Sequence, residues 1–232
     1  MLMKQLFHTS DCGRVGEWLP RGWQETVVPL FRYENLPLDV QSIHWAENHY
    51  CIFTSQRAVR AIVELGLIGI LQQHVHIAFY VVGQQTARAL LDAGIPATHI
   101  ATHNMQELAE YLLQKNITQR KGIFWGASVL ASFTTQWLEN NPCCQHIPVY
   151  VQHMVEVSTE LSTQINNRAT CVLATSPSAI RYLSALSVAR DIELVVLGTS
   201  SLQTAEEEGF QRIHCAPSPS VQLAVEYSVS IF

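Results

Sequence analysis

Hydrophobic residues in this chain occur in short, uniform runs, and each run is followed by a polar turn and a segment with apolar residues at helical spacing. The runs at 79–82 and 194–197 are apolar at every position. Strands that bury both faces have this composition, and they are typical of parallel sheets covered by helices on both sides. The pattern therefore predicts an α/β fold.

The pattern occurs twice along the chain. The segment 52–62 is echoed by 173–183, with Thr, Ser, Ala and Arg at equal offsets, and each copy continues through an apolar run to a glycine, Gly83 or Gly198. Each copy is typical of a strand, a Thr-Ser turn, a helix, a second strand, a Gly turn and a second helix. We therefore expect two lobes, each built on a doubly wound parallel sheet.

Two further segments, 27–35 and 146–154, are extended, rich in β-forming residues and interrupted by Pro. We interpret them as a two-stranded β linker between the lobes rather than as core strands. A chain that crosses twice makes one lobe discontinuous. The predicted division is residues 1–32 with 154–232 in a discontinuous α/β lobe and 36–145 in an inserted α/β lobe.

The polar turns stand where an open parallel sheet binds its ligands, beyond the carboxyl ends of its strands. Two lobes joined by a linker are expected to form a cleft there. Helix starts present unpaired N–H groups and the positive end of a dipole, so the turns are candidate anion sites. The residues at these turns are Thr54, Ser55, Gly83, Thr86, Thr175, Ser176, Gly198, Ser200 and Ser201. The alternative is that their side chains serve only as ordinary helix caps.

Composition and charge restrict the class of protein. The 232 residues are 48% hydrophobic and 14% charged, which excludes intrinsic disorder. The formal net charge of -5 and the lack of a basic block argue against nucleic acid as a partner. No apolar stretch approaches the ~20 residues that span a bilayer, and the first residues lack the features of a secretion signal. We therefore expect no membrane contact and a cytoplasmic location.

The sequence contains no familiar motif for a nucleotide, a metal or a covalent nucleophile. It has neither GxxxxGK[ST] nor GxGxxG, and it lacks the GxSxG turn of α/β-hydrolases. The six cysteines form no CxxC pair, so we expect reduced thiols rather than a metal site. Phosphate-bearing cofactors and covalent catalysis are therefore disfavoured.

Three segments resemble the uroporphyrinogen-III synthase family: Phe-Thr-Ser-Gln-Arg-Ala-Val at 53–59, Val-Gly-Gln-Gln-Thr-Ala-Arg-Ala-Leu at 82–90, and the pair Val149-Tyr150. Later segments resemble the family's second Ser-Pro turn, its second Gly turn and the entry of its C-terminal helix, at 175–178, 198–209 and 216–219. The resemblance implies two lobes joined by a two-stranded linker, in a monomeric lyase that needs no cofactor. The implied reaction closes hydroxymethylbilane to uroporphyrinogen III, with inversion of ring D through a spiro intermediate, in haem and other tetrapyrrole biosynthesis.

The resemblance also implies site residues and partners. Tyr150 matches the family's linker tyrosine, which is proposed to help the terminal hydroxyl of the substrate depart, although it could instead be an aromatic packed between linker strands. His103 and Asn104 occupy a further turn that is expected to bind substrate. Hydroxymethylbilane carries eight carboxylates, which suit the N–H groups and hydroxyls at helix starts. Transient contact with the deaminase that produces this substrate is also implied.

Two turns depart from the family pattern, and so does the pair Val151-Gln152 after Tyr150, where the family has a residue followed by Thr. The family's first strand commonly ends in a Thr-Arg-Pro-like turn, whereas this chain has His8-Thr9-Ser10-Asp11 and lacks that arginine. The turn Thr102-His103-Asn104 stands where the family has a turn that contains Gly. These departures leave open an alternative of another class, a non-catalytic two-lobed protein that binds a polycarboxylate tetrapyrrole precursor or regulates its synthesis.

Overall fold

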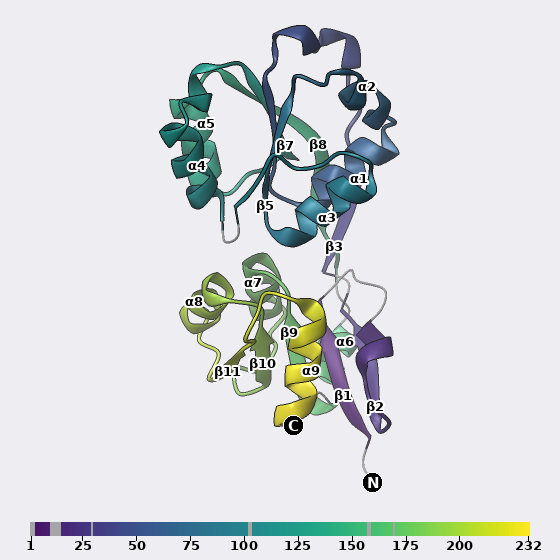
Figure 1. Cartoon of the computed structure of the whole chain (residues 1–232). Coiled ribbons are helices and arrows are strands. Elements are labelled where there is room, and N and C mark those ends of the chain that lie inside the picture. Colours follow the sequence, from purple (N-terminus) through teal and green to yellow (C-terminus); the bar gives the residue numbers. More distant parts are fainter. Residues whose placement is uncertain (1–2, 10–14, 29, 102–103, 157–158, 169) are drawn as a thin grey trace. The chain divides into compact units, whose positions relative to one another are not determined.

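The computed structural model describes residues 3–9, 15–28, 30–101, 104–156, 159–168 and 170–232. It separates the chain into two compact units (Figure 1). One unit combines Met1–Arg32 with Met154–Phe232 and is called the discontinuous lobe below. The other unit, Tyr33–His153, is called the inserted lobe. The chain therefore passes between the two units twice.

The inserted lobe is built on a six-stranded sheet with the strand order β3-β8-β7-β4-β5-β6. Its strands are β3 (Phe31–Asn35), β4 (Tyr50–Phe53), β5 (Ala78–Val82), β6 (His99–Ala101), β7 (Gly122–Ala127) and β8 (Cys144–Met154). Its α-helices are α1 (Gln56–Glu64), α2 (Ile68–Gln73), α3 (Gln84–Asp92), α4 (Met105–Gln114) and α5 (Ser132–Asn140). Short 3-10 helices lie at η2 (Val40–Ser42), η3 (Trp45–Glu47) and η4 (Ile117–Gln119). The pairs β4·β5, β5·β6, β4·β7 and β7·β8 are parallel.

Helices cover both faces of this sheet. Cys51 and Phe53 of β4 belong to a core shared with α1, α2 and α3. Tyr50 and Ile52, which point to the opposite face, belong to a core shared with α4 and α5. Figure 1 shows α4 and α5 on one side of the sheet and α1, α2 and α3 on the other. Burial on both faces explains why β4 is apolar at all four positions.

The discontinuous lobe has a five-stranded sheet with the order β11-β10-β9-β1-β2, and all of its pairs are parallel. Its strands are β1 (Lys4–His8), β2 (Trp23–Val27), β9 (Cys171–Ala174), β10 (Glu193–Val196) and β11 (Arg212–Cys215). Its helices are η1 (Val15–Trp18), α6 (Thr159–Arg168), α7 (Pro177–Ala185), α8 (Thr199–Glu207) and α9 (Val221–Ile231). One core packs α6, α7 and α8 on the sheet, and a second core packs α9 and η1 on the other face.

The repeat found in the sequence corresponds to a repeated structure. The unit β4-α1-β5-α3-β6 of the inserted lobe has the same order of elements as β9-α7-β10-α8-β11 of the discontinuous lobe, with α2 added after α1. In both sheets these three strands are neighbours in chain order, and the remaining strands lie on the other side of the first. The predicted α/β fold with two doubly wound parallel sheets is therefore confirmed.

The interpretation of 146–154 as a linker strand outside the core needs correction. This segment continues β8, which pairs in parallel with β7 from Cys144 to Tyr150. Ile147 and Val149 are buried in the same core as β4. Ile147 and Val149 therefore belong to the sheet core of the inserted lobe, but β8 also pairs with β3 on its other side, so the two predicted linker segments do contribute a pair of neighbouring strands.

The segment 27–35 is likewise not a single strand. Val27 ends β2, and the N–H of Val28 still donates a hydrogen bond to the carbonyl of His8, at the end of β1, over 2.8 Å. Strand β3 begins only at Phe31. The first part of the predicted linker strand therefore belongs to the sheet of the discontinuous lobe, because its backbone pairs with β1.

Among the described residues, no helix is both long and apolar enough to cross a membrane.

Candidate active site

The inserted lobe has a point where its strand order reverses. From β4 the chain moves outward through β5 and β6, then returns to β7 on the other side of β4 and continues to β8. Ligands of doubly wound sheets bind beyond the carboxyl ends of the strands at such a reversal. Thr54 and Ser55 follow β4 directly at this place, and Ser128 follows β7.

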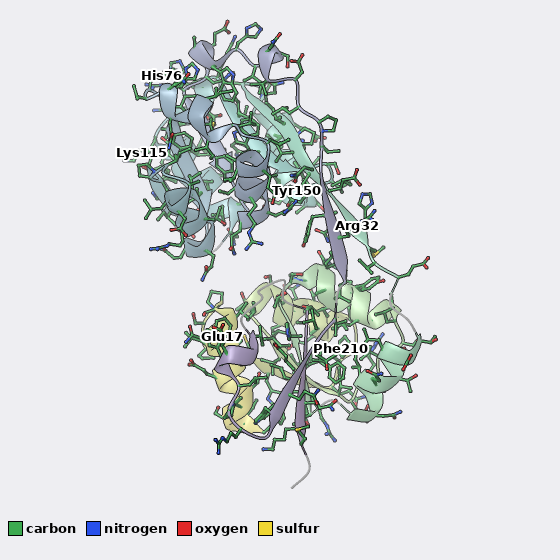
Figure 2. All side chains as sticks on the ribbon, turned by 90° about the vertical axis from the view of Figure 1, so that its right-hand side faces the viewer. Glu17, Arg32, His76, Lys115, Tyr150 and Phe210 are labelled. Carbon is green, nitrogen blue, oxygen red and sulfur yellow. The ribbon has the colours of Figure 1, made fainter. Side chains whose placement is uncertain are left out.

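Ser55 connects the helix that follows β4 with Tyr150. Its Oγ accepts a hydrogen bond from the N–H of Ala58 over 3.1 Å and so caps α1, as the sequence predicts. The same Oγ lies 3.3 Å from the hydroxyl oxygen of Tyr150. Either hydroxyl can donate in this contact, because a serine oxygen that accepts from a helix N–H can still donate its own proton or accept a second one. Tyr150 lies on β8 within the inserted lobe (Figure 2).

A β-bulge turns Tyr150 toward Ser55. Gly126 is opposite Pro148 and Ala127 is opposite Tyr150, so Val149 is an extra residue in β8. An extra residue reverses the alternation of side chains along a strand, and both Val149 and Tyr150 consequently face the core that contains α1. Pro148 has no N–H to donate, which suits a place where the ladder is interrupted. The N–H of Ser128 then donates to the carbonyl of Tyr150 over 2.8 Å.

The ring of Tyr150 is buried and is fixed by aromatic packing. Tyr150 is 7% exposed. Its ring makes an edge contact with Tyr33 of β3, with the centroids 5.8 Å apart. The guanidinium of Arg57, in the first turn of α1, lies over the Tyr33 ring at 5.5 Å from its centroid. Neither Tyr33 nor Arg57 is among the site residues predicted from the sequence. The repeat does not draw attention to Arg57, because the second copy has Ser178 at the matching position.

The discontinuous lobe presents a similar pair of side chains at its own reversal, between β1 and β9. The Oγ1 atoms of Thr9 and Thr175 are 3.1 Å apart, and the N–H of Thr175 donates to the Oγ1 of Thr9 over 2.9 Å. Ser176 caps α7 through the N–H of Ala179, at 3.2 Å. The sequence predicts Thr175 and Ser176 at such a turn, whereas it presents Thr9 only as part of a departure from the family pattern. Ser10 and Asp11 lie outside the described residues.

The two Gly turns open the second helix of each repeat. Gly83 precedes α3 with φ 83° and ψ 142°, a conformation that only glycine adopts readily, and Gly198 precedes α8. Thr86 and Ser201, at matching positions in these helices, are each 4% exposed, so their hydroxyls face the interior of their lobes. Ser200 is exposed. Thr199, Gln84 and Gln85 at these turns are exposed as well, so they, Ser200 and the first N–H groups of the helices are candidate ligand contacts.

Asn104 belongs to a separate turn of the inserted lobe. Its side-chain oxygen accepts from the N–H of Glu107 over 3.0 Å and caps α4. His103, the other candidate in this turn, lies outside the described residues. The structure therefore brings Ser55 together with Tyr150 and Thr175 together with Thr9, whereas the side chain of Asn104 serves its own helix.

The one titratable side chain with a shifted pKa near these turns is His146 of β8, among the residues described. Its Nε2 lies 3.0 Å from the carbonyl oxygen of Ala127, at the end of β7. Burial lowers the pKa of His146 below the ordinary histidine value, and the contact with Ala127 opposes this only in part. A neutral imidazole is therefore favoured beside the turn that follows β7.

No cluster of three or more His, Cys, Asp or Glu side chains suited to a metal ion occurs in the part of the chain that the structure describes. Cysteines in the described residues are free thiols, at Cys51, Cys143, Cys144, Cys171 and Cys215. The groups that converge at the strand ends are instead hydroxyls and backbone N–H groups. Such groups bind carboxylates and donate protons or hydrogen bonds to oxygen atoms.

Comparison with known proteins gives one family. The family model described as uroporphyrinogen-III synthase HemD matches residues 19–226. The solved uroporphyrinogen-III synthetase of Helicobacter pylori is 18% identical with a TM-score of 0.68, and the match covers 99% of this chain and 100% of that chain. A mutant uroporphyrinogen III synthase from the extremely thermophilic bacterium Thermus thermophilus is 13% identical with a TM-score of 0.66, over 99% and 100% of the two chains. No curated protein sequence matches the chain significantly.

Proposed function

This chain belongs to the uroporphyrinogen-III synthase family, whose members are cofactor-independent lyases of tetrapyrrole biosynthesis, and we propose that Tyr150 is the acid that starts its reaction. The substrate is hydroxymethylbilane, which the enzyme closes to uroporphyrinogen III with inversion of ring D. The observation that carries the proposal is the 3.3 Å contact between the Tyr150 hydroxyl and the Oγ of Ser55.

The first step needs a proton for a poor leaving group. The terminal hydroxyl of hydroxymethylbilane departs as water when an acid protonates it, and the substrate becomes an azafulvene. Either hydroxyl can donate in the contact between Ser55 and Tyr150. In the proposed arrangement Ser55, whose Oγ accepts from the N–H of Ala58, donates its own proton to the Tyr150 oxygen. The proton of Tyr150 is then free to point at the substrate. This arrangement makes Tyr150 the hydrogen-bond donor and Ser55 its support.

The same contacts stabilise the tyrosine after it has given up its proton. A phenolate at Tyr150 keeps the hydrogen bond from Ser55 and lies at the start of α1, where the helix dipole favours negative charge. The remaining steps, attack through the spiro intermediate and closure of the rearranged ring, depend on how the substrate is held. Tyr150 can recover its proton when the final ring loses one.

We propose that backbone N–H groups and hydroxyls bind the substrate carboxylates. Thr54 with Ser55 and Thr175 with Ser176 form Thr-Ser turns that precede α1 and α7, and Gly83 and Gly198 precede α3 and α8. His103, Asn104, Thr86, Ser200 and Ser201 complete the proposed binding set. The buried Thr86 and Ser201 would act by fixing the first turns of their helices. A protein with net charge -5 gains most from such fixed dipoles, because they attract carboxylates without added cationic side chains.

We further propose that the enzyme acts as a cytoplasmic monomer that takes its substrate from the preceding deaminase by transient contact. Hydroxymethylbilane closes to the type I isomer without a catalyst, so rapid transfer protects the yield of type III. Light scattering of the purified protein, alone and mixed with the deaminase, measures both the oligomeric state and the contact. A stable dimer at micromolar concentration would contradict the monomer.

The reaction is tested with freshly generated hydroxymethylbilane, followed by oxidation of the products and chromatographic separation of the porphyrin isomers. We expect an excess of type III over a control without protein. Tyr150→Phe should lower kcat about a hundred-fold, since a positioned general acid contributes roughly 10²–10⁴-fold. Tyr111→Phe is the matched control in the same lobe, because Tyr111 stacks on His99, away from these turns.

Three results would decide between the possibilities. Type I alone with the native protein would refute the catalytic function and favour a binding protein for a polycarboxylate. Type III at an undiminished rate from Tyr150→Phe would keep the enzyme and refute the acid. Equal losses in Tyr150→Phe and Tyr111→Phe would indicate a general effect of removing a phenolic hydroxyl from the inserted lobe.

A further inference from the structure

The first turn of α1 contains a charged side chain that is held on both sides. Arg57 lies two residues after Ser55, and its Nη2 donates to the Oδ1 of Asn35 over 2.8 Å. The same nitrogen is 3.4 Å from the Oε2 of Glu64, at the end of α1. The Nδ2 of Asn35 donates to that carboxylate oxygen over 2.6 Å. Arg57, Asn35 and Glu64 therefore form a closed triangle between α1 and β3.

The triangle is firmer than an ordinary surface ion pair. The Arg57 side chain is only 20% exposed, although that of Glu64 is 49% exposed. A planar guanidinium that bonds an amide oxygen and a carboxylate has little freedom to rotate. It contributes little stability by its charge alone, since exposed pairs are weak. Its consequence is a fixed position for the guanidinium plane.

The guanidinium of Arg57 contacts Tyr150 indirectly, through the ring of Tyr33. Arg57 lies over the Tyr33 ring at 5.5 Å from the centroid, and the Tyr33 ring meets the Tyr150 ring at 5.8 Å with an interplanar angle of 71°. Cation–π and edge-to-face contacts both have preferred geometries. The orientation of Arg57 therefore restricts Tyr33, and Tyr33 in turn restricts the ring of Tyr150.

Both ends of Tyr150 are thus held from the start of α1. Ser55 fixes the hydroxyl oxygen at 3.3 Å, and Arg57, acting through Tyr33, fixes the ring. We infer that Arg57 is a positioning residue for the proposed acid Tyr150, not a ligand of the substrate. This inference rests on the proposed function, because Tyr150 has to act in the reaction for its position to affect the rate.

The test compares Arg57→Met with the native enzyme in the isomer assay. Methionine keeps an unbranched apolar stem but removes the planar cation, so we expect kcat to fall about ten-fold, with KM changed by less than about two-fold. Arg57→Lys should restore only part of kcat, because an ammonium does not form the planar fork. Arg88→Met is the matched control, since Arg88 is a 71% exposed arginine of α3 paired with Asp92.

A double variant separates positioning from a purely structural effect. Arg57→Met in the Tyr150→Phe background should cause no further loss of kcat, because no tyrosine hydroxyl remains to be positioned. Tyr33→Leu reaches the same contact from the other side and leaves the pair of Arg57 with Glu64 intact. Tyr33→Leu alone should lower kcat as much as Arg57→Met does. Combined with Tyr150→Phe, it should cause no further loss of kcat. Near-ultraviolet circular dichroism verifies that each variant is folded.

The outcomes distinguish the positioning role of Arg57 from the proposed acid role of Tyr150. If Tyr150→Phe lowers kcat and Arg57→Met does not, the positioning role is overturned and the acid remains. Full additivity of Arg57→Met with Tyr150→Phe, or a rise in KM with unchanged kcat, would also overturn it, the latter in favour of substrate binding. An unaffected Tyr150→Phe enzyme would refute the acid and the positioning residue together.

Discussion

The hydroxyl oxygen of Tyr150 lies 3.3 Å from the Oγ of Ser55, although the two residues are 95 positions apart in the chain. Ser55 caps a helix and Tyr150 ends the part of β8 that pairs with β7, so each has a local reason to be where it is. Their contact combines a helix start with a phenol. That combination supplies the proposed acid with a donor for its oxygen and a favourable dipole.

Replacement of the two capping serines should have different kinetic effects. Ser55→Ala and Ser176→Ala each remove a side-chain cap, so each should lower the free energy of unfolding by about 1 kcal/mol. Only Ser55 contacts Tyr150, and loss of that hydrogen bond should lower kcat by roughly three- to ten-fold. Ser176→Ala should instead act mainly on KM. Steady-state kinetics and urea unfolding of both variants measure the two effects, and identical kinetic profiles would contradict the special role of Ser55.

The pair formed by Thr9 and Thr175 gives a test in the discontinuous lobe. Thr9→Val keeps the shape of the side chain but removes the oxygen that accepts from the N–H of Thr175. We expect a loss of about 1–3 kcal/mol in stability, since a partly buried N–H is left without its partner, and a several-fold rise in KM because the turn before α7 is loosened. Thr9→Ser retains the oxygen and should behave like the native enzyme. A normal KM in a destabilised Thr9→Val enzyme would limit this pair to a structural role.

The buried imidazole of His146 should make stability depend on pH. Its pKa is below the ordinary histidine value in the folded protein because of burial, and it returns to about 6.5 on unfolding. As pH falls through that value, the unfolded chain binds a proton first, so the free energy of unfolding decreases with decreasing pH and levels off below the folded pKa. Urea unfolding at pH 7, 6 and 5 measures this trend. His146→Gln should show a smaller decrease than the native protein, whereas parallel curves for the two proteins would refute the assignment.

Gly122 is expected to be essential for packing at the start of β7. A Cβ added there would lie 2.2 Å from the Cζ of Tyr50, a side chain that is 1% exposed. Gly122→Ala should therefore lower the free energy of unfolding by about 1–3 kcal/mol through overpacking. Gly69→Ala, in α2, meets no atom within 4 Å and should raise stability by about 0.5–1 kcal/mol through helix propensity. Thermal unfolding of the two variants compares them directly, and a neutral Gly122→Ala protein would show that the Tyr50 ring moves aside freely.

Much of the fold was predictable because its signals are local. Strands such as β4 and β9 are buried on both faces, so every residue in them is apolar, and this is visible without knowledge of the partner strands. Ser55 and Ser176 could be assigned as caps because the N–H groups that they accept from lie only three residues away. The repeat then predicted two lobes of the same kind.

Other features were missed because they arise from contacts between distant segments. The core position of β8 depends on its pairing with β7, and a strand in the sheet and a strand of a linker have the same composition. Thr9 was seen only as part of an altered turn, since its partner Thr175 is 166 residues away. Arg57 carries no local signal, because an arginine near the start of a helix is ordinarily solvated.

The sequence by itself determined the α/β class, the two copies of the repeated unit, the capped helix starts and the resemblance that identifies the family. These follow from periodicity and from contacts within a few residues. Only the tertiary structure decided which side chains meet at the strand ends. A one-residue bulge beside Gly126 turns Tyr150 to the face of Ser55 and Tyr33, and a strand without that bulge would present its tyrosine to the other side of the sheet.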